Sequence, residues 1–161
     1  MHFGATKKCY TSLEELNRNI AIINGPNLNL LGKREPAVYG NESFEDCLLK
    51  LKSAYPQVNF TYFQSNVEGE LVNAIQQYGF NQDGMILNPA AYTHTSVAIG
   101  DAIASIQTPV IEVHISNIQA REDFRKISHV SAKVVGSIVG LGLNGYHLAT
   151  AWFVDQAASK S

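Results

Sequence analysis

The sequence predicts an α/β fold in which helices cover both faces of a parallel five-stranded sheet. Short apolar runs alternate with amphipathic segments from residue 20 onward, and a helix separates each predicted strand from the next. The chain has 161 residues, of which 45% are hydrophobic and 16% charged, as suits one domain with a large core. We expect residues 1–18 to be an N-terminal extension, either frayed or forming one short helix, and residues 19–161 to form a single domain.

The first half of this domain shows two strand–helix pairs. An uninterrupted apolar run such as "NIAIIN" is typical of a strand buried on both faces. Ser43 is a good helix N-cap, Pro56 cannot continue that helix, and Gly79 is suited to end the next one. The predicted elements are a strand at 19–24, a helix at 43–55, a strand at 57–65 and a helix at 67–79.

The second half repeats the alternation, with Pro109 placed just before a strand. Here we expect a strand at 84–88, a helix at 93–106, a strand at 110–116, a short helix near 120–127, a strand at 133–140 and a final helix from about 142 to 157. Because strand–helix–strand crossovers are right-handed, these elements predict a flavodoxin-like three-layer sandwich with strand order 2-1-3-4-5.

Composition excludes several kinds of partner. The formal net charge is −2, and no basic cluster is longer than Lys7-Lys8 or Lys33-Arg34, so we expect no nucleic-acid partner. No segment approaches the roughly twenty apolar residues of a membrane span, so we expect no membrane partner. Cys9 and Cys47 match no disulfide or metal motif, which favours the reducing cytoplasm.

Polar residues follow the ends of the first, third and fourth predicted strands, in the segments "NGPN", "NPAAYTH" and "EVHIS". In a doubly wound sheet the ligand site lies beyond the carboxyl ends of the strands, near the point where the strand order reverses. We therefore expect Asn24, Asn27, Asn88 and His94 at one rim, either as caps of loops and helices or as ligand-binding groups.

Glu112 and His114 are unexpected in a strand that should be buried on both faces. Residues two apart share one face of a strand, so the carboxylate can orient the imidazole or hold it protonated. A purely structural pair is the alternative. A metal site is a third interpretation, but the other candidate ligands lack a metal-binding spacing.

Three of the four arginines fall in or beside these segments, namely Arg34, Arg121 and Arg125. A guanidinium group carries a permanent charge and a fixed fork of donors suited to a carboxylate. The last two are spaced i, i+4, so a helix there would present both on one face. Solvated surface arginines are the alternative.

Four segments, "INGPNLNLLGKREPAVYG", "NPAAYTHTS", "IEVHISNIQAREDFR" and "GLGLNGYHLA", together resemble the type II 3-dehydroquinate dehydratases. The resemblance spans roughly residues 20 to 155, in the order and spacing of the family. Two departures are a longer leader and Ala90, which stands where many members have glycine.

The resemblance implies an anti elimination of water from 3-dehydroquinate through an enolate, with Tyr39 as the base and His114 as the general acid. A free tyrosine has a pKa of about 10, so a nearby guanidinium, here Arg34, is expected to lower it. Gly32 and Gly40 would be hinges of a lid that carries both residues. The family uses no metal and no cofactor, so none is expected.

The remaining roles also come from the resemblance. Asn27 would hold a water beside the enolate oxygen, and Glu112 would orient His114. Asp101 would reach the site of a neighbouring subunit in a homododecamer built as a tetramer of trimers. Residues expected to bind the substrate's hydroxyls and carboxylate are Asn88, His94, Ile115, Ser116, Arg121 and Arg125.

The same fold also serves FMN-binding electron carriers and phosphoacceptor receiver domains. A receiver needs acidic residues after the first strand and an aspartate after the third, where this chain has "NGPN" and Asn88. An FMN carrier needs a Ser/Thr/Gly phosphate loop, where Pro26 and a leucine-rich segment stand. An inactive relative is a third alternative, although every catalytic position of the family is filled.

Overall fold

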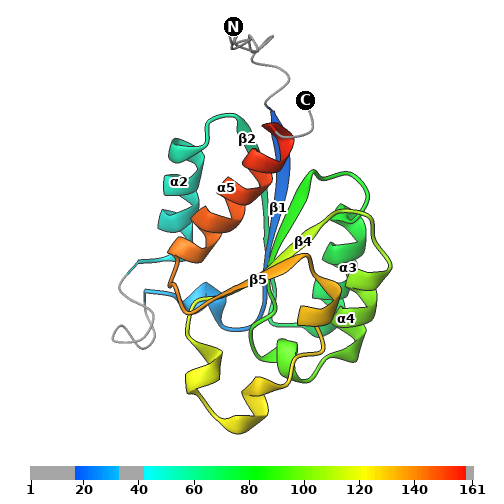
Figure 1. Ribbon diagram of the computed structural model, residues 1–161. Coiled ribbons are helices and arrows are strands. Elements are labelled where there is room, and N and C mark those ends of the chain that lie inside the picture. The colour runs from blue at the N-terminus through cyan, green and yellow to red at the C-terminus, as the bar shows by residue number, and fades with distance from the viewer. Residues whose placement is uncertain (1–16, 33–41, 159–161) are drawn as a thin grey trace, which may run out of the picture.

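The computed structural model describes residues 17–32 and 42–158. A parallel sheet with strand order β2-β1-β3-β4-β5 lies between two layers of helices (Figure 1). This confirms the predicted flavodoxin-like sandwich and its strand order. The strands are β1 (Arg18–Asn24), β2 (Val58–Gln64), β3 (Gly84–Asn88), β4 (Val110–His114) and β5 (Gly136–Val139), and the helices are α2 (Phe44–Ala54), α3 (Glu68–Tyr78), α4 (Val97–Ala104) and α5 (Asn144–Ala158).

Successive side chains of the central strands enter two separate cores, one on each face of the sheet. Ile20 and Ile22 of β1 pack with α2 and α5, whereas Ala21 and Ile23 pack with α3 and α4. Figure 1 shows these two helix pairs on opposite sides of the sheet. Because both faces are covered, β1 and β3 must be apolar at every interior position, and a charged residue in β4 is exceptional.

The helix boundaries that local chemistry predicts are confirmed for α2 and α3. Ser43 Oγ accepts from the Asp46 amide at 3.1 Å, and Asp46 Oδ2 accepts from the Ser43 amide at 3.3 Å, which completes a capping box. Gly79 is the C-cap of α3.

The helix predicted from residue 93 begins later, at Val97. Ser96 is its N-cap, because Ser96 Oγ accepts from the Ile99 amide at 2.9 Å. His94 therefore lies in a preceding 3-10 turn, η3 (Ala90–His94). Apolar periodicity continues through the cap, so the pattern alone placed the start too early.

The prediction of one short helix near 120–127, with Arg121 and Arg125 on one face, is wrong. The chain instead makes two 3-10 turns, η4 (Ile118–Ala120) and η5 (Asp123–Lys126), and Arg121 between them is extended with φ −104° and ψ −159°. The predicted strands at 110–116 and 133–140 are shorter as well, since β4 ends at His114 and a 3-10 turn, η6 (Ser131–Lys133), precedes β5.

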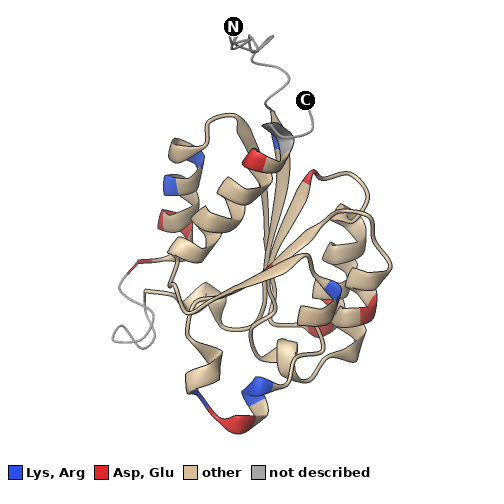
Figure 2. Ribbon diagram, viewed as in Figure 1, with Lys and Arg blue, Asp and Glu red and all other residues tan. Residues whose placement is uncertain are grey.

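Charged residues are scattered along the described chain, apart from one mixed group on the segment after β4 (Figure 2). This group contains Arg121, Glu122, Asp123, Arg125 and Lys126. Among the described helices, none combines the length and the apolar character that crossing a lipid bilayer requires.

We expect Gly100→Ala to lower the free energy of unfolding by about 1–3 kcal/mol, the usual range for overpacking. A Cβ at this position of α4 would lie 2.4 Å from the carbonyl oxygen of His129, so the backbone of one segment must move. Gly69→Ala in α3 is the matched control, because its Cβ would meet nothing within 4 Å. Urea unfolding at equal protein concentration measures both, and equal stabilities of the two variants would contradict the expected clash.

Candidate active site

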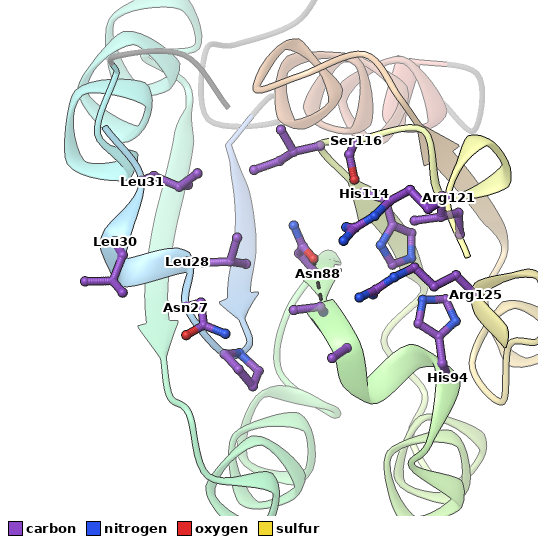
Figure 3. A pocket seen from close by; sticks show the side chains of 15 residues that line it. Asn27, Leu28, Leu30, Leu31, Asn88, His94, His114, Ser116, Arg121 and Arg125 are labelled. Carbon is purple, nitrogen blue, oxygen red and sulfur yellow. Dashed lines mark hydrogen bonds between the residues drawn. The ribbon is translucent and has the colours of Figure 1, made fainter. Parts of the chain in front are cut away.

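A cavity of about 170 Å³ opens beyond the carboxyl ends of β1, β3 and β4. Figure 3 shows leucine side chains on one side of it and two histidines with two arginines on the other. The residues that line the cavity are Pro26, Asn27, Leu28, Leu30, Leu31, Asn88, Ala90, Ala91, His94, His114, Ile115, Ser116, Ile118, Arg121 and Arg125.

A close backbone approach brings the ends of β1 and β3 together. The Gly25 amide donates to the Asn88 carbonyl oxygen at 2.8 Å, and a Cβ on Gly25 would lie 2.7 Å from the Pro89 oxygen. Glycine is therefore required at this position. Two residues on, Asn27 adopts φ 67°, and its amide donates to Asn66 Oδ1 at 2.9 Å. This left-handed turn directs the chain along the edge of the cavity.

The carboxamide of Asn88 is held in one orientation. Its Oδ1 accepts from the Ala90 amide at 3.1 Å, and its Nδ2 donates to the Tyr146 hydroxyl at 3.1 Å. Tyr146 in turn donates to Asn24 Oδ1 at 2.8 Å, and burial raises its pKa, which keeps the hydroxyl protonated. The second Nδ2 hydrogen of Asn88 is left for the cavity.

Ala90 adopts a backbone conformation that favours glycine. Its φ is 53°, in the left-handed region that costs an L-residue about 1–2 kcal/mol. The amide of this residue is the one that fixes Asn88. Alanine at position 90 therefore preserves the hydrogen bond to Asn88 but adds backbone strain.

Glu112 is fully buried and accepts hydrogen bonds at both carboxylate oxygens. Its Oε1 accepts from Thr93 Oγ1 at 2.5 Å and lies 2.9 Å from His114 Nε2. Its Oε2 accepts from Ser131 Oγ at 2.6 Å and from Ser137 Oγ at 3.1 Å. The prediction that Glu112 and His114 share one face of the strand is confirmed by this contact.

These contacts favour an ionised Glu112. Burial by itself would raise the pKa of the carboxyl group, but hydrogen bonds from His114, Ser131 and Thr93, together with the charge of a protonated His114, lower it to about 2. An ionised carboxylate at Nε2 requires a hydrogen on that nitrogen. The other ring nitrogen, Nδ1, is then the one that can carry the exchangeable proton.

His94 lies beside His114, with their ring centroids 6.4 Å apart. Its Nδ1 is 2.7 Å from the carbonyl oxygen of Ile127, which can only accept, so Nδ1 carries the hydrogen. The Nε2 atom is buried and has no hydrogen-bond partner among the described residues. In the neutral ring this nitrogen is an acceptor, which suits a ligand hydroxyl in the cavity.

Two guanidinium groups enter the same side of the cavity (Figure 3). Glu122 binds the Nε of Arg125 at 2.7 Å and lies 3.5 Å from the Nε of Arg121. The Arg125 guanidinium also lies 5.0 Å from the ring centre of Phe124. Since Glu122 engages each arginine at Nε, the terminal nitrogens have no partner among the described residues and can bind an anion.

The structure brings most of the predicted site residues together but not all. Asp101 is exposed on α4 and is not among the cavity residues of its own chain. Arg34 and Tyr39, with the predicted hinge Gly40, lie outside the described residues. The predicted residues that line the cavity are Asn27, Asn88, His94, His114, Ile115, Ser116, Arg121 and Arg125.

Sequence reasoning missed the groups behind the site. Thr93, Ser131 and Ser137 bind Glu112 from three separate segments, and Tyr146 fixes Asn88. Tyr146 stands in the quoted segment "GLGLNGYHLA", which is the one signal that pointed to it. Within residues 17–32 and 42–158, no group of three or more His, Cys, Asp or Glu side chains is placed to hold a metal ion.

The fold and the cavity together define an acid–base enzyme of the flavodoxin-like α/β class that suits a small polar anion. Comparison with known proteins identifies the family within this class. The chain belongs to the family described as dehydroquinase class II, whose model matches residues 18–154.

Individual relatives agree with this assignment. A 3-dehydroquinate dehydratase of Fusobacterium nucleatum is 52% identical over 142 residues, covering 84% of this chain and 96% of the relative. One from Bacillus pumilus is 48% identical over 142 residues, covering 87% and 97%. The crystal structure of a type II dehydroquinase from Butyrivibrio crossotus superimposes with a TM-score of 0.81 at 45% identity, covering 85% of this chain and 97% of that one.

Glu112 should make stability depend on acid pH. Because its pKa is lowered on folding from 4.5 to about 2, its contribution is fully present above about pH 5 and is lost as the pH falls toward 2. We expect Glu112→Gln to be less stable than wild type at pH 7, with the difference narrowing at about pH 3.

Urea unfolding at several pH values measures this difference. Glu45→Gln, which removes one carboxylate at an exposed position, gives the matched control. A constant difference between Glu112→Gln and wild type across the whole range would show that Glu112 is not ionised in the folded protein.

Proposed function

We propose that this protein catalyses the dehydration of 3-dehydroquinate to 3-dehydroshikimate in the shikimate pathway, the third step toward chorismate, in the cytoplasm. Membership of the dehydroquinase class II family supports the reaction. The single observation that carries it is the Glu112–His114 pair at the edge of a cavity lined by Arg121 and Arg125. This places a group able to donate a proton beside groups able to bind a carboxylate.

His114 serves as the general acid for the departing hydroxyl. Ionised Glu112 accepts the Nε2 hydrogen, which leaves Nδ1 to carry the proton that the ring donates. The Nδ1 hydrogen of that ring then passes to the oxygen that leaves as water. After this transfer the ring remains in the tautomer that Glu112 fixes.

Tyr39 serves as the base, and this role rests on the family resemblance alone. It removes the proton next to the substrate ketone and generates the enolate, while Arg34 lowers its pKa. Asn27 holds a water near the enolate oxygen. Base and acid act on opposite sides of the breaking bonds, which gives an anti elimination.

The substrate carboxylate and hydroxyls bind the polar side of the cavity. His94 Nε2 accepts from a hydroxyl, because its Nδ1 hydrogen is already used by Ile127. The free Nδ2 hydrogen of Asn88 donates to another. Arg125 and Arg121, with the backbone and hydroxyl at Ile115-Ser116, hold the remaining hydroxyl and the carboxylate.

Purified protein mixed with 3-dehydroquinate should produce the ultraviolet absorbance of a conjugated enone. Tyr39→Phe, which keeps the ring and loses the hydroxyl, should lower turnover at least about a hundredfold. Circular dichroism establishes that both proteins are folded. No absorbance rise with folded wild type would remove the proposed function, and near-normal turnover of Tyr39→Phe would assign the base to another group.

The active assembly is a homododecamer, a tetramer of trimers, in which Asp101 completes a neighbouring site. Two observations support this part of the proposal: Asp101 is exposed on α4, and it lies outside the cavity of its own chain. It stands beside Val97, which is 58% exposed, so an apolar and a charged side chain face outward together. An adjoining subunit would cover the first and use the second.

Mixed oligomers test this arrangement. Asp101→Ala and Tyr39→Phe should each be poorly active, whereas oligomers containing both kinds of subunit should regain activity wherever an intact Tyr39 meets an intact Asp101. Light scattering gives the mass of each sample, and unmixed proteins at the same concentration are the control. A fully active monomer, or normal kinetics for Asp101→Ala, would refute the proposal.

A further inference from the structure

The segment from Ile127 to Ser131 contacts the groups behind both histidines of the site. The Ile127 carbonyl accepts from His94 Nδ1, and the His129 amide donates to the Thr93 carbonyl oxygen at 2.9 Å. At the end of the segment, Ser131 Oγ donates to Glu112 Oε2 at 2.6 Å. Residues 127–131 lie outside the sheet, so the segment is an added support for the rim.

Ser131 is held in place by Ser128. The amides of Val130 and Ser131 donate to Ser128 Oγ at 3.1 and 2.8 Å, and the two serine hydroxyl oxygens are 2.9 Å apart. A hydroxyl has one hydrogen, and the Glu112 carboxylate is the stronger acceptor for the hydrogen of Ser131. The hydrogen of Ser128 then bridges the two serines, so Ser131 is oriented toward Glu112.

The two carboxylate oxygens of Glu112 have different hydrogen-bond partners. Oε1 accepts from Thr93 and meets His114, so it already has two partners. Oε2 has only hydroxyl partners, and Ser131 at 2.6 Å is closer than Ser137 at 3.1 Å. A fully buried carboxylate that loses a donor turns or admits water to recover one. Ser131 is therefore the closer of the two donors that hold Oε2, and through that oxygen it helps to fix the carboxylate plane.

We propose that Ser131 is a positioning residue that acts on His114 through Glu112 and thereby sets how efficiently the departing hydroxyl is protonated. This inference rests on the proposed dehydration. Ser131 does not line the cavity, so it has no direct contact with a ligand there. It is exposed, while Glu112 is fully buried, so truncating it removes a hydrogen bond and little packing.

The effect should be confined to one step of the reaction. Loss of the Ser131 donor disturbs the carboxylate that holds the Nε2 hydrogen of His114, so the imidazole ring is less well oriented to protonate the departing hydroxyl. Removal of the substrate proton by the base does not involve this carboxylate. Exchange of that proton with solvent should therefore continue while elimination slows.

The experiment compares Ser131→Ala, Ser131→Cys and Ser131→Thr with wild type. Threonine keeps the hydroxyl donor, and cysteine keeps the side-chain size with only a weak donor. We expect kcat to fall about tenfold in the alanine variant, a small part of the roughly hundred- to ten-thousandfold effect of a general acid, with KM within about twofold. The cysteine variant should lie between, and threonine should stay near wild type.

The decisive measurement is the ratio of substrate proton exchange, followed by NMR in deuterium oxide, to elimination. This ratio should rise in Ser131→Ala in the same direction as in His114→Ala. Exposed Ser53 on α2 gives the control, since Ser53→Ala should match wild type in both rates.

The outcomes test the role of Ser131 separately from the proposed dehydration. Exchange and elimination that fall together, or an unchanged ratio in both the alanine and cysteine variants, would overturn the role of Ser131. If Ser131→Ala does not fold, the size-matched cysteine variant decides alone. Wild type that shows neither exchange nor elimination would instead refute the proposed dehydration.

Discussion

The site depends on keeping an ionised carboxylate inside a parallel sheet. Glu112 is fully buried in β4, where both faces are covered and an unpaired charge would cost several kcal/mol. Donors from three other segments and from His114 offset that cost. Those donors come from η3, η6 and β5, so the chain must bring these three elements around the end of β4 for the charge to be tolerated.

The segments that surround Glu112 also hold the two histidines of the site in place. The turn η3 supplies Thr93 to Glu112 and His94 to the cavity. In the segment 127–131, Ile127 binds His94 and Ser131 binds Glu112. Glu112 thus fixes one nitrogen of His114, and the Ile127 carbonyl fixes one nitrogen of His94. The remaining nitrogens differ in their proposed roles, an acceptor on His94 and a proton carrier on His114, although both residues are of the same type.

The sequence predicted the fold and the rim well because both depend on local patterns. Apolar runs and caps define the elements, and a period of two places Glu112 with His114. The 3-10 turns around Arg121 were not predictable from spacing, since i, i+4 assumes a continuous helix. Nor were Ser131 and Ser137, because a serine carries no signal of its own until tertiary structure places it beside a charge. The described residues do not include Tyr39 or Arg34, whose roles stay predictions.

The cavity differs from the nucleotide-binding sites that the same fold forms in other proteins. Where nucleotide-binding relatives of this sheet need backbone amides free to hold a phosphate, this chain has a left-handed Asn27 followed by buried Leu28 and Leu31. An apolar wall there leaves the anion to the guanidinium groups across the cavity (Figure 3). Under the proposed function, this contrast between the two walls orients a small acid, with its charged end beside the arginines and its hydroxyls within reach of the histidines.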